Sequence, residues 1–354
     1  MQKILTAIVP VYNSAKYVKN CLDSLNHPEI NVIVNIDGGS TDDSSKIVEE
    51  YCHDKPNFTI IHSPHQGVMS ARQECLKFVN TPFFSFVDSD DTVNIKNYVS
   101  LCHAMQDNSY KIGNGRTTVF LPNCPIPFNS RKWDKTTIDF AKDKKELSNT
   151  TCTFWDKIFS NDSIELFQGT SHQKVYEDLE FVYHALANKR LMFHTNDLIY
   201  NYRMHESSAS ATGLDILKVD GLKGLLSATS SMQEKFKQSH LLEEYQSELD
   251  AITIKLVYQR IYNILKNPKI ENKKEMAELV FQILSAYIPN WEQNPYFLEG
   301  FKGSELNDYL FYIITKILIH LNNVQITKKE DDYQALLSSY NAKLVLKKCY
   351  RSQK

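Results

Sequence analysis

Three carboxylates within four residues are the feature of this sequence that most directly suggests chemistry. Asp88-Ser-Asp-Asp91 follows the apolar run Phe83–Val87, where a buried strand would end. Repulsion between these carboxylates would be costly without a cation, and Mg²⁺ or Mn²⁺ takes oxygen ligands from one or two carboxylates together with substrate phosphates. The alternative is a solvated acidic turn that caps the next helix, since Asp favours such positions. Taken alone, so short a string favours the solvated turn.

A second polar turn, Asp37-Gly-Gly-Ser-Thr-Asp42, follows another apolar run. Gly38 and Gly39 allow close backbone approach, and the free amides at the start of the next helix suit an anion or the polar edge of a base. Ser40 or Thr41 could instead do no more than cap that helix. For this turn on its own, the two interpretations are equally good.

Charged residues also stand near the starts of two predicted helices. A basic side chain there opposes the helix dipole, so we expect an anionic or acceptor partner for Arg72; a surface salt bridge is the plain alternative. Acidic residues are favoured at a helix start, which suffices to explain one of Glu177 and Asp178. Two adjacent carboxylates near a cleft could also supply a general base that takes a proton from an acceptor hydroxyl.

A later segment, Leu198–Ser210, interleaves aromatic residues with basic and hydroxyl side chains. A single histidine is more often structural than functional. Here Arg203 and His205, together with Ser207 and Ser208, would offer several hydrogen-bond donors to phosphate oxygens.

The elements that must position these residues alternate in the first third of the chain. Apolar, β-branched runs at 4–11, 31–36, 58–61 and 83–87 are separated by stretches of helical character. This rhythm is typical of βαβ units and a mainly parallel sheet, so the predicted fold class is α/β. Ligands of such sheets bind beyond the carboxyl ends of the strands, which is where the polar turns fall.

The character of the chain changes further along. Residues 106–150 are polar and punctuated by Gly and Pro, which predicts short strands or loops. From about Leu214 apolar residues recur at helical spacing, with further predicted helices at 274–287, 305–321 and 332–348. We therefore expect two domains, 1–213 and a helical domain at 214–354.

Composition excludes several classes of protein. The chain has 354 residues, of which 40 are basic and 42 acidic, for a net charge of -2. No global positive field exists to hold nucleic acid, which we do not expect as a partner. The seven cysteines contain no Cys-x-x-Cys pair, which favours reduced thiols over a disulfide framework or a zinc site. The first apolar run is too short for a signal peptide, and Tyr309–Leu321 is too short to cross a bilayer, so we expect a cytoplasmic protein.

In their order along the chain, these segments resemble family 2 of the glycosyltransferases, whose members have the GT-A fold. The resemblance covers about residues 1–212, and the ordered set is more specific than any single string. The matching motifs are Ile8-Val-Pro-Val-Tyr-Asn13, Asp37-Gly-Gly-Ser-Thr-Asp42, Ser70-Ala-Arg72, Asp88-Ser-Asp-Asp91, Trp155-Asp-Lys-Ile-Phe159, Glu177-Asp178 and Tyr200-Asn-Tyr-Arg-Met-His205. The resemblance implies a Rossmann-like, nucleotide-diphospho-sugar transferase sheet with an appended helical domain.

The same resemblance implies a nucleotide diphosphate sugar as donor, most often a UDP-sugar. Pro10, Tyr12 and Asp37 would hold the nucleoside, and Arg72 would lie near the base. The residues implied to contact the nucleotide sugar are Pro10, Val11, Tyr12, Asn13, Asp37, Gly38, Arg72, Asp88, Ser89, Asp90, Glu177, Arg203 and His205. Many relatives have two consecutive acids before the Gly-Ser, whereas here Gly38 follows Asp37.

Catalytic roles also follow from the resemblance. Asp88 and Asp90 would form the metal motif for Mn²⁺ or Mg²⁺, with Asp90 the direct ligand and His205 near the metal or diphosphate. Asp178 would be the catalytic base. The implied reaction is inverting transfer of a hexose or N-acetylhexosamine to a hydroxyl of a glycan, teichoic acid or glycoprotein.

Other functions stay open at this point. One is a non-catalytic nucleotide- or glycan-binding scaffold. Another is a sugar nucleotidyltransferase, which would normally need a glycine-rich, basic loop where this chain has Pro10–Ser14. The helical region could bind acceptor, form a homo-oligomer or brace the first domain. The basic tail 343–354 could rest on the inner face of an anionic membrane, or simply end a solvated helix.

Overall fold

The computed structural model describes residues 2–121, 128–130, 132–169, 176–205, 219–266 and 282–298. The chain divides into two compact units, Met1–Gln246 and Ser247–Lys354. The residues that could do chemistry all belong to the first unit.

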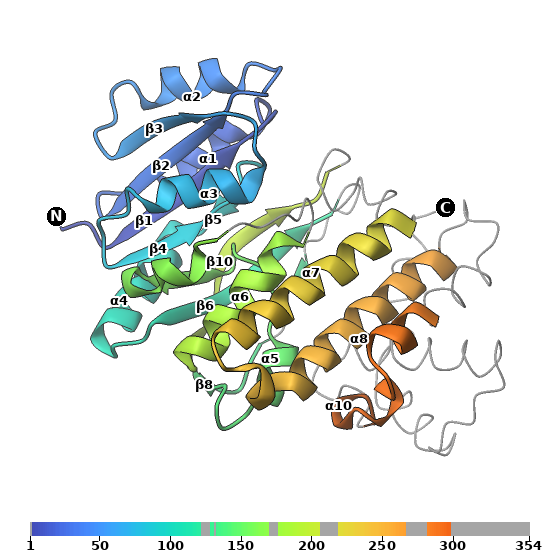
Figure 1. Ribbon diagram of the computed structural model, residues 1–354. Helices are drawn as coiled ribbons and strands as arrows, with labels where there is room; N and C mark the ends of the chain where they lie inside the picture. Colours follow the sequence, from blue (N-terminus) through green and yellow to red (C-terminus); the bar gives the residue numbers. More distant parts are fainter. Residues whose placement is uncertain are drawn as a thin grey trace. The chain divides into compact units, whose positions relative to one another are not determined.

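Four parallel strands form the first half of its sheet, as the alternating apolar runs predict. β1 lies between β2 and β4, and β3 pairs with the outer side of β2. In Figure 1, α3 crosses in front of these strands and α1 lies behind them, so both faces are covered. The elements are β1 (Leu5–Val11), α1 (Val18–Leu25), β2 (Ile30–Asp37), α2 (Ser44–Cys52), β3 (Phe58–Ser63), α3 (Val68–Leu76) and β4 (Phe83–Phe86).

The second half of the sheet mixes directions. β9 is antiparallel to both β4 and β6, whereas β10 is parallel to β6. The described strands therefore run β3-β2-β1-β4-β9-β6-β10-β5, with β7 on β6 and β8 on β10. The elements are β5 (Thr92–Val93), α4 (Ile95–Asp107), β6 (Ile112–Phe120), β7 (Phe128–Asn129), β8 (Thr137–Asp139), α5 (Lys145–Asn149), β9 (Lys157–Ser160), the 3₁₀ helix η1 (Asn161–Phe167), α6 (Glu177–Lys189) and β10 (Leu191–Arg203).

The long strand β10 matters most for function. Its register shifts between His194 and Leu198, and its last third pairs with the short strand β5, Tyr200 opposite Val93. Since β5 directly follows the acidic run, this pairing brings the segment from Tyr200 to His205 against the end of β4. Strand pairing thus joins two sequence motifs that are more than 100 residues apart.

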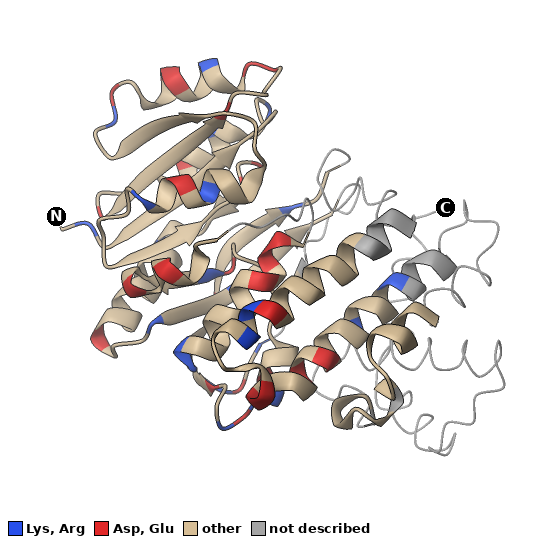
Figure 2. Ribbon diagram, viewed as in Figure 1, with Lys and Arg blue, Asp and Glu red and all other residues tan. Residues whose placement is uncertain are grey.

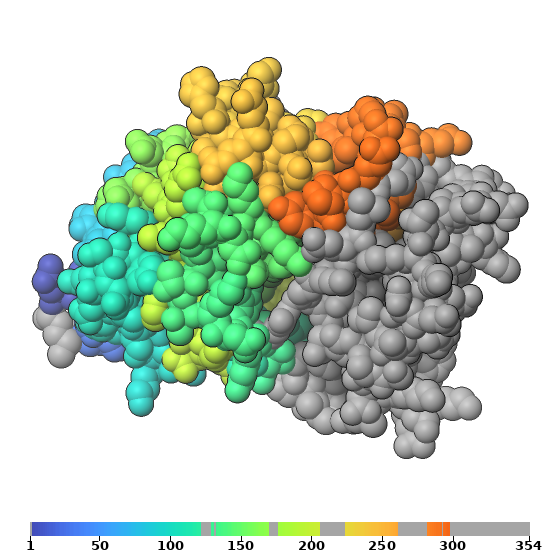
Figure 3. Space-filling view, turned by 90° about the horizontal axis from the view of Figure 1, so that it is seen from below, coloured from blue at the N-terminus to red at the C-terminus, as the bar shows by residue number. Residues whose placement is uncertain are grey.

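The first unit carries charges of both signs along its chain, and part of the polar middle of the chain lies at its surface. Figure 2 shows Lys and Arg interspersed with Asp and Glu, with acids gathered at the start of α6. In Figure 3, the described part of 106–150, teal to green, lies at the surface. It contains the short strands that the sequence predicts there.

Two long helices follow, α7 (Val219–Gln238) and α8 (Leu242–Lys266). The end of α7 packs on α6, where His184 Nε2 lies 2.6 Å from Ser239 Oγ. The first compact unit ends at Gln246, and the domain boundary at residue 213 stays a prediction. The second unit also holds the short elements η2 (Trp291–Gln293) and α10 (Pro295–Leu298), whose Trp291 and Phe297 rings meet edge to face at 4.8 Å.

Several predictions fall on other parts of the chain. The helices predicted at 305–321 and 332–348, the tail 343–354 and most of the helix at 274–287 lie outside the described residues. The five described cysteines, Cys21, Cys52, Cys75, Cys102 and Cys152, are unpaired. No helix in the described ranges combines the length and apolar character needed to cross a membrane.

Candidate functional site

Buried hydroxyl groups tie together the turns that follow β1, β2 and β4. Ser14 Oγ lies 2.6 Å from Ser89 Oγ, and the Ser14 amide donates to Ser44 Oγ at 2.7 Å. All three side chains are buried. Asp42 accepts from the Ser44 hydroxyl and from the Ala15 amide, which fixes the start of α2 against the β1 turn. Ser89, the second residue of the acidic run, is therefore fixed against the turn that follows β1.

Tyr12, His65 and Asp37 form an open stack at the ends of β1, β3 and β2. Both carboxylate oxygens of Asp37 lie within 3.0 Å of His65 Nδ1, and Asp37 Oδ1 accepts from the Gly39 amide at 2.8 Å. The His65 ring stacks on Tyr12 at 5.0 Å, and Tyr12 stays 50% exposed. A side chain at position 39 would collide with His65, because an added Cβ would lie 2.8 Å from its ring. An exposed aromatic beside a carboxylate suits a nucleobase, which offers a π-face and a polar edge.

Sequence reasoning missed His65. The only signal for it was its place in Ser63-Pro-His65-Gln-Gly67, directly after the third apolar run at the same sheet edge. Asn13, which the resemblance did single out, has a left-handed backbone with φ 47°, and its Oδ1 accepts from the Thr41 amide at 2.7 Å. Pro10 and Val11 are the last two residues of β1, and the Gly38 amide donates to Ser63 O.

The acidic run divides into three environments. Asp91 is buried and internal: its carboxylate accepts from the Tyr200 hydroxyl at 2.8 Å and from the Arg203 amide at 2.6 Å. Burial, reinforced by Asp88 and Asp90, raises its pKa to about 9. The third acid thus anchors β10 to the end of β4, which explains one carboxylate of the run without a cation.

Asp90 and His205 form the second environment. Asp90 Oδ2 lies 2.8 Å from His205 Nε2, and the His205 ring packs on Tyr17 at 4.6 Å. The Arg203 guanidinium also lies over the Tyr17 ring, 5.1 Å from its centroid. Tyr17, another residue that sequence reasoning missed, therefore supports both predicted diphosphate contacts. Ser207 and Ser208 lie outside the described residues.

Asp90 and His205 could hold a divalent cation only if the substrate or water supplied its other ligands. A carboxylate and an imidazole suit Mn²⁺, and Mg²⁺ commonly keeps one or two carboxylates plus substrate phosphates. Asp90 and His205 offer one of each. No cluster of three or more His, Cys, Asp or Glu side chains within the described residues is arranged to hold a metal. The remaining ligands would thus have to come from the substrate or from water.

Asp88 occupies the third environment, an ion-pair bridge. Arg72 donates from one terminal nitrogen to Asp88 Oδ1 at 2.9 Å and from the other to Glu177 Oε1 at 2.8 Å. Its side chain is only 6% exposed, and the guanidinium lies over the ring of Phe154 at 4.9 Å. The acceptor partner expected for this helix cation is therefore two carboxylates, one at the end of β4 and one at the start of α6.

This bridge brings the two ends of the site together. Glu177 opens α6, and Asp178 is its neighbour, so one guanidinium separates the acidic run from the predicted base. Tyr176, immediately before them, has a left-handed backbone with φ 63°, which is uncommon for a bulky residue and often marks a functional turn. Asp88 binds Arg72 here, and its metal role stays a prediction, as does that of Asp90.

Asp178 is partly buried beside a thiol. Its Oδ2 lies 3.8 Å from Cys152 Sγ, which belongs to the segment before β9. Desolvation and the adjacent Glu177 charge raise the pKa of Asp178 to about 7, against the opposite effects of Arg72 and Lys157. A carboxylate with a pKa near neutrality can both accept and release a proton, as a general base requires.

Comparison with known proteins gives a consistent result. Residues 6–163 match the family model described as Glycosyl transferase family 2. The putative glycosyltransferase EpsH of Bacillus subtilis is 25% identical over 266 residues, covering 71% of this chain and 74% of that protein. Chondroitin synthase of Pasteurella multocida is 22% identical over 296 residues, or 81% of this chain and 29% of that protein. S. aureus TarS 1–349 in complex with UDP-GlcNAc shares the fold with TM-score 0.58 and 19% identity, covering 90% of this chain and 89% of that one.

The Arg72 bridge predicts a large stability difference between two Arg-to-Gln substitutions. Arg72→Gln leaves two carboxylates at a buried site without their cation, so the free energy of unfolding should fall by about 3 to 5 kcal/mol. Arg190→Gln is the matched control, because Arg190 pairs with Glu244 at 3.0 Å at the surface, where such a pair contributes about 1 kcal/mol or less. Urea denaturation would measure both; equal losses would contradict the assigned role of Arg72.

Proposed function

We propose that the chain is a family 2 glycosyltransferase with a GT-A fold followed by a helical region, and that it transfers a sugar from a nucleotide diphosphate sugar to a hydroxyl of a bacterial surface glycan. The observation that carries this proposal is the Asp88–Arg72–Glu177 bridge, which joins the acidic run to the helix that bears Asp178. A transferase needs its donor diphosphate and its base at adjacent positions, and the bridge supports such an arrangement because it links the acidic run to the start of α6.

A UDP-sugar is the donor that we favour. The Tyr12 ring stays exposed for stacking, and the Asp37 carboxylate can accept from the imide N–H of uracil. TarS, a structural relative, was solved with UDP-GlcNAc and with UDP. His65 takes part of the acceptor capacity of Asp37, in a turn where many relatives have a second acid. We therefore assign the nucleobase contact to Tyr12, Asp37 and His65 together.

Asp90 and His205 are the residues that would hold Mn²⁺ or Mg²⁺, together with diphosphate oxygens. Such a cation offsets the negative charge that develops on the departing diphosphate. Arg203, fixed over Tyr17, stands beside this pair and can donate to phosphate oxygens. His205 is held in place by Asp90 and Tyr17, so its orientation is set before the donor binds.

Asp178 acts as general base in a single in-line displacement, so the transfer is inverting. Its carboxylate takes the proton of the acceptor hydroxyl while the hydroxyl oxygen forms a bond to the anomeric carbon and the bond to the nucleoside diphosphate breaks. During this displacement, the ion pair between Glu177 and Arg72 keeps the start of α6 attached to Arg72, which also binds Asp88. A raised pKa suits this task because the proton must later leave to solvent.

The proposed acceptor class rests on the relatives. EpsH is named a putative glycosyltransferase, and the Pasteurella multocida relative is named a chondroitin synthase. We propose a hexose or N-acetylhexosamine as the transferred sugar and a glycan, teichoic acid or glycoprotein hydroxyl as acceptor. The region after residue 214 would bind acceptor, form a homo-oligomer or contact the inner face of a membrane from the cytoplasm.

Removal of the base should separate chemistry from donor binding. Asp178→Asn should lower turnover of UDP-GlcNAc in Mn²⁺ by about 10²- to 10⁴-fold while the affinity for UDP stays within about twofold of wild type, because the side chain acts only as the bond forms. Release of UDP measures the first quantity and isothermal titration the second. The exposed Asp197→Asn is the control and should match wild type. Near wild-type turnover in Asp178→Asn would show that another group is the base.

The pH dependence should report the same carboxylate. Only ionised Asp178 accepts a proton, so kcat/KM should rise with pH through a midpoint near 7. Glu177→Gln removes a neighbouring negative charge that raises this pKa, and should move the midpoint to lower pH. Because the pKa in the folded state exceeds about 3.9 in the unfolded chain, the stability that protonated Asp178 contributes is lost as pH rises from about 4 through 7. A midpoint that Glu177→Gln leaves unchanged would contradict the assignment.

Metal dependence should require Asp90. Wild-type protein should bind UDP more tightly in Mn²⁺ than in EDTA, whereas Asp90→Ala should bind UDP with the same affinity in both, because the carboxylate ligand is gone. Melting-temperature shifts at a series of UDP concentrations would measure both affinities. The exposed Asp107→Ala should behave as wild type. If wild-type affinity is equal in Mn²⁺ and EDTA, Asp90 has no metal role in donor binding.

A further inference from the structure

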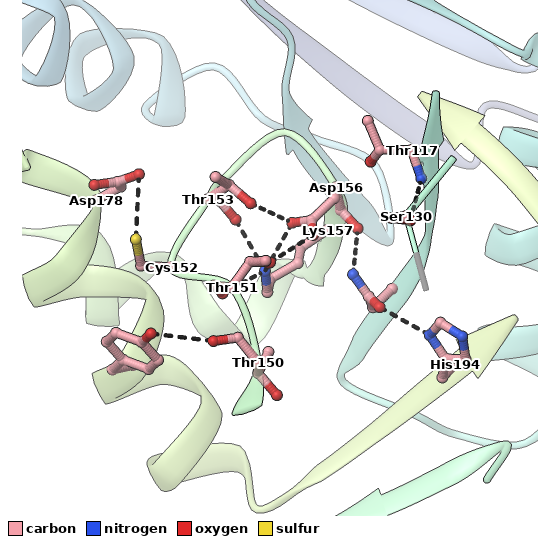
Figure 4. Close-up of polar contacts among 12 residues, drawn as sticks. Thr117, Ser130, Thr150, Thr151, Cys152, Thr153, Asp156, Lys157, Asp178 and His194 are labelled. Carbon is pink, nitrogen blue, oxygen red and sulfur yellow. Dashed lines mark hydrogen bonds and ion pairs between the residues drawn. The ribbon is translucent and has the colours of Figure 1, made fainter. Parts of the chain in front are cut away.

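The segment Thr150–Lys157, whose Phe154 ring lies under the Arg72 guanidinium, also lies directly beside the proposed base. It connects α5 to β9, and one of its side chains, Cys152, contacts Asp178. Figure 4 shows the Cys152 thiol pointing at the Asp178 carboxylate on one side of this segment and Lys157 at its centre. The segment therefore directs a hydrogen-bond donor, the Cys152 thiol, at Asp178, the proposed base.

Lys157 fixes the backbone on both sides of Cys152. Its Nζ donates to the carbonyl oxygens of Thr151 at 2.8 Å and Thr153 at 3.0 Å, the two residues that flank Cys152. The same Nζ also lies 2.7 Å from Asp156 Oδ1 and 3.0 Å from Thr151 Oγ1. Lys157 is fully buried. Because all of its hydrogen bonds stay within seven residues, the ammonium group acts as the centre of a rigid turn.

Asp156, the acid of this turn, also makes its side-chain hydrogen bonds within the turn. Asp156 accepts from the hydroxyls of Thr151 at 2.7 Å and Thr153 at 2.9 Å. A buried ion pair is a poor source of net stability, since desolvation of both charges offsets their attraction. What such a pair does provide is a defined geometry, and here the geometry is that of the residue between the two threonines.

The segment is also attached to the helix that carries the base. The Tyr183 hydroxyl, on α6, donates to Thr150 O at 3.1 Å. On the other side of Asp178, Glu177 is held by Arg72. The start of α6 is therefore fixed by Arg72 from α3 and by Thr150–Lys157 from the side of β9, with the Asp178 carboxylate between them.

From this arrangement we propose that Cys152 is a positioning residue for Asp178: its thiol donates to the carboxylate and holds it in the orientation that accepts the proton of the acceptor hydroxyl. The inference rests on the proposed function, because it needs Asp178 as the base. It assigns a role to a residue that belongs to none of the motifs in the sequence. The charged groups that act on Asp178 are Glu177 on its own helix, Arg72 on α3 and Lys157 on β9.

Substitutions at position 152 distinguish positioning from simple packing. Cys152→Ala removes the donor, and Cys152→Ser restores one with a hydroxyl. Cys52→Ala is the control, because Cys52 is another free cysteine and lies away from Asp178 at the end of α2. Each variant is measured for UDP release from UDP-GlcNAc in Mn²⁺, for the pH midpoint of kcat/KM and for melting temperature.

We expect Cys152→Ala to lower kcat by about 10-fold with donor KM unchanged, since the base is misplaced but the donor site is intact. A lost donor destabilises the ionised carboxylate, so the pH midpoint should rise by about half a unit. Cys152→Ser should return both quantities toward wild type, and Cys52→Ala should leave both unchanged.

Other results would overturn the inference. Cys152→Ala with wild-type kcat, or with a midpoint that is unchanged or lower, would show that the thiol does not hold the carboxylate. Asp178→Asn in the same assay distinguishes a failure of the Cys152 role from a failure of the base assignment. If Asp178→Asn is inactive while Cys152→Ala matches wild type, only the role of Cys152 fails; if Asp178→Asn is active, the base assignment fails and this inference fails with it.

Discussion

The buried guanidinium of Arg72 is the interaction on which the rest of this site depends. A cation that is only 6% exposed needs its counter-charges in place, and both come from elements far away in the sequence: Asp88 at the end of β4 and Glu177 at the start of α6. Moving either element would leave a charge buried without a partner, which costs several kcal/mol. The donor side and the acceptor side of the proposed reaction are thereby held at a constant separation by one side chain.

A second buried cation, Lys157, binds only partners that are close to it in the sequence. Its partners lie within seven residues, so it shapes one turn, whereas Arg72 joins elements 105 residues apart. Both cations favour the ionised form of Asp178, while desolvation and Glu177 favour the protonated form. The raised pKa of the proposed base is therefore due mainly to burial and next to the Glu177 charge, and Arg72 and Lys157 offset it only in part.

The three acids of the run at 88–91 show how environment divides identical side chains. Asp91 meets a tyrosine hydroxyl and a backbone amide, and becomes part of the fold. Asp88 meets Arg72 and becomes part of the bridge. Asp90 meets His205 and stays near the position where a diphosphate would bind. A repulsive cluster is thus divided among a hydrogen-bonded anchor, an ion pair and a carboxylate with capacity for a metal ion.

The amino-acid sequence by itself determined the α/β alternation, the polar turns at the strand ends and the motifs that mark the family, because these are local patterns of hydrophobicity and residue type. It could not identify the two acids that bind Arg72, the internal role of Asp91, or His65 and Cys152 beside the predicted residues. Those contacts depend on the order of strands in the sheet, where β9 inserts antiparallel between β4 and β6 and β10 returns to pair with β5. Only the tertiary structure decides them, since the periodicity of a strand indicates which face is buried but not which distant strand lies beside it.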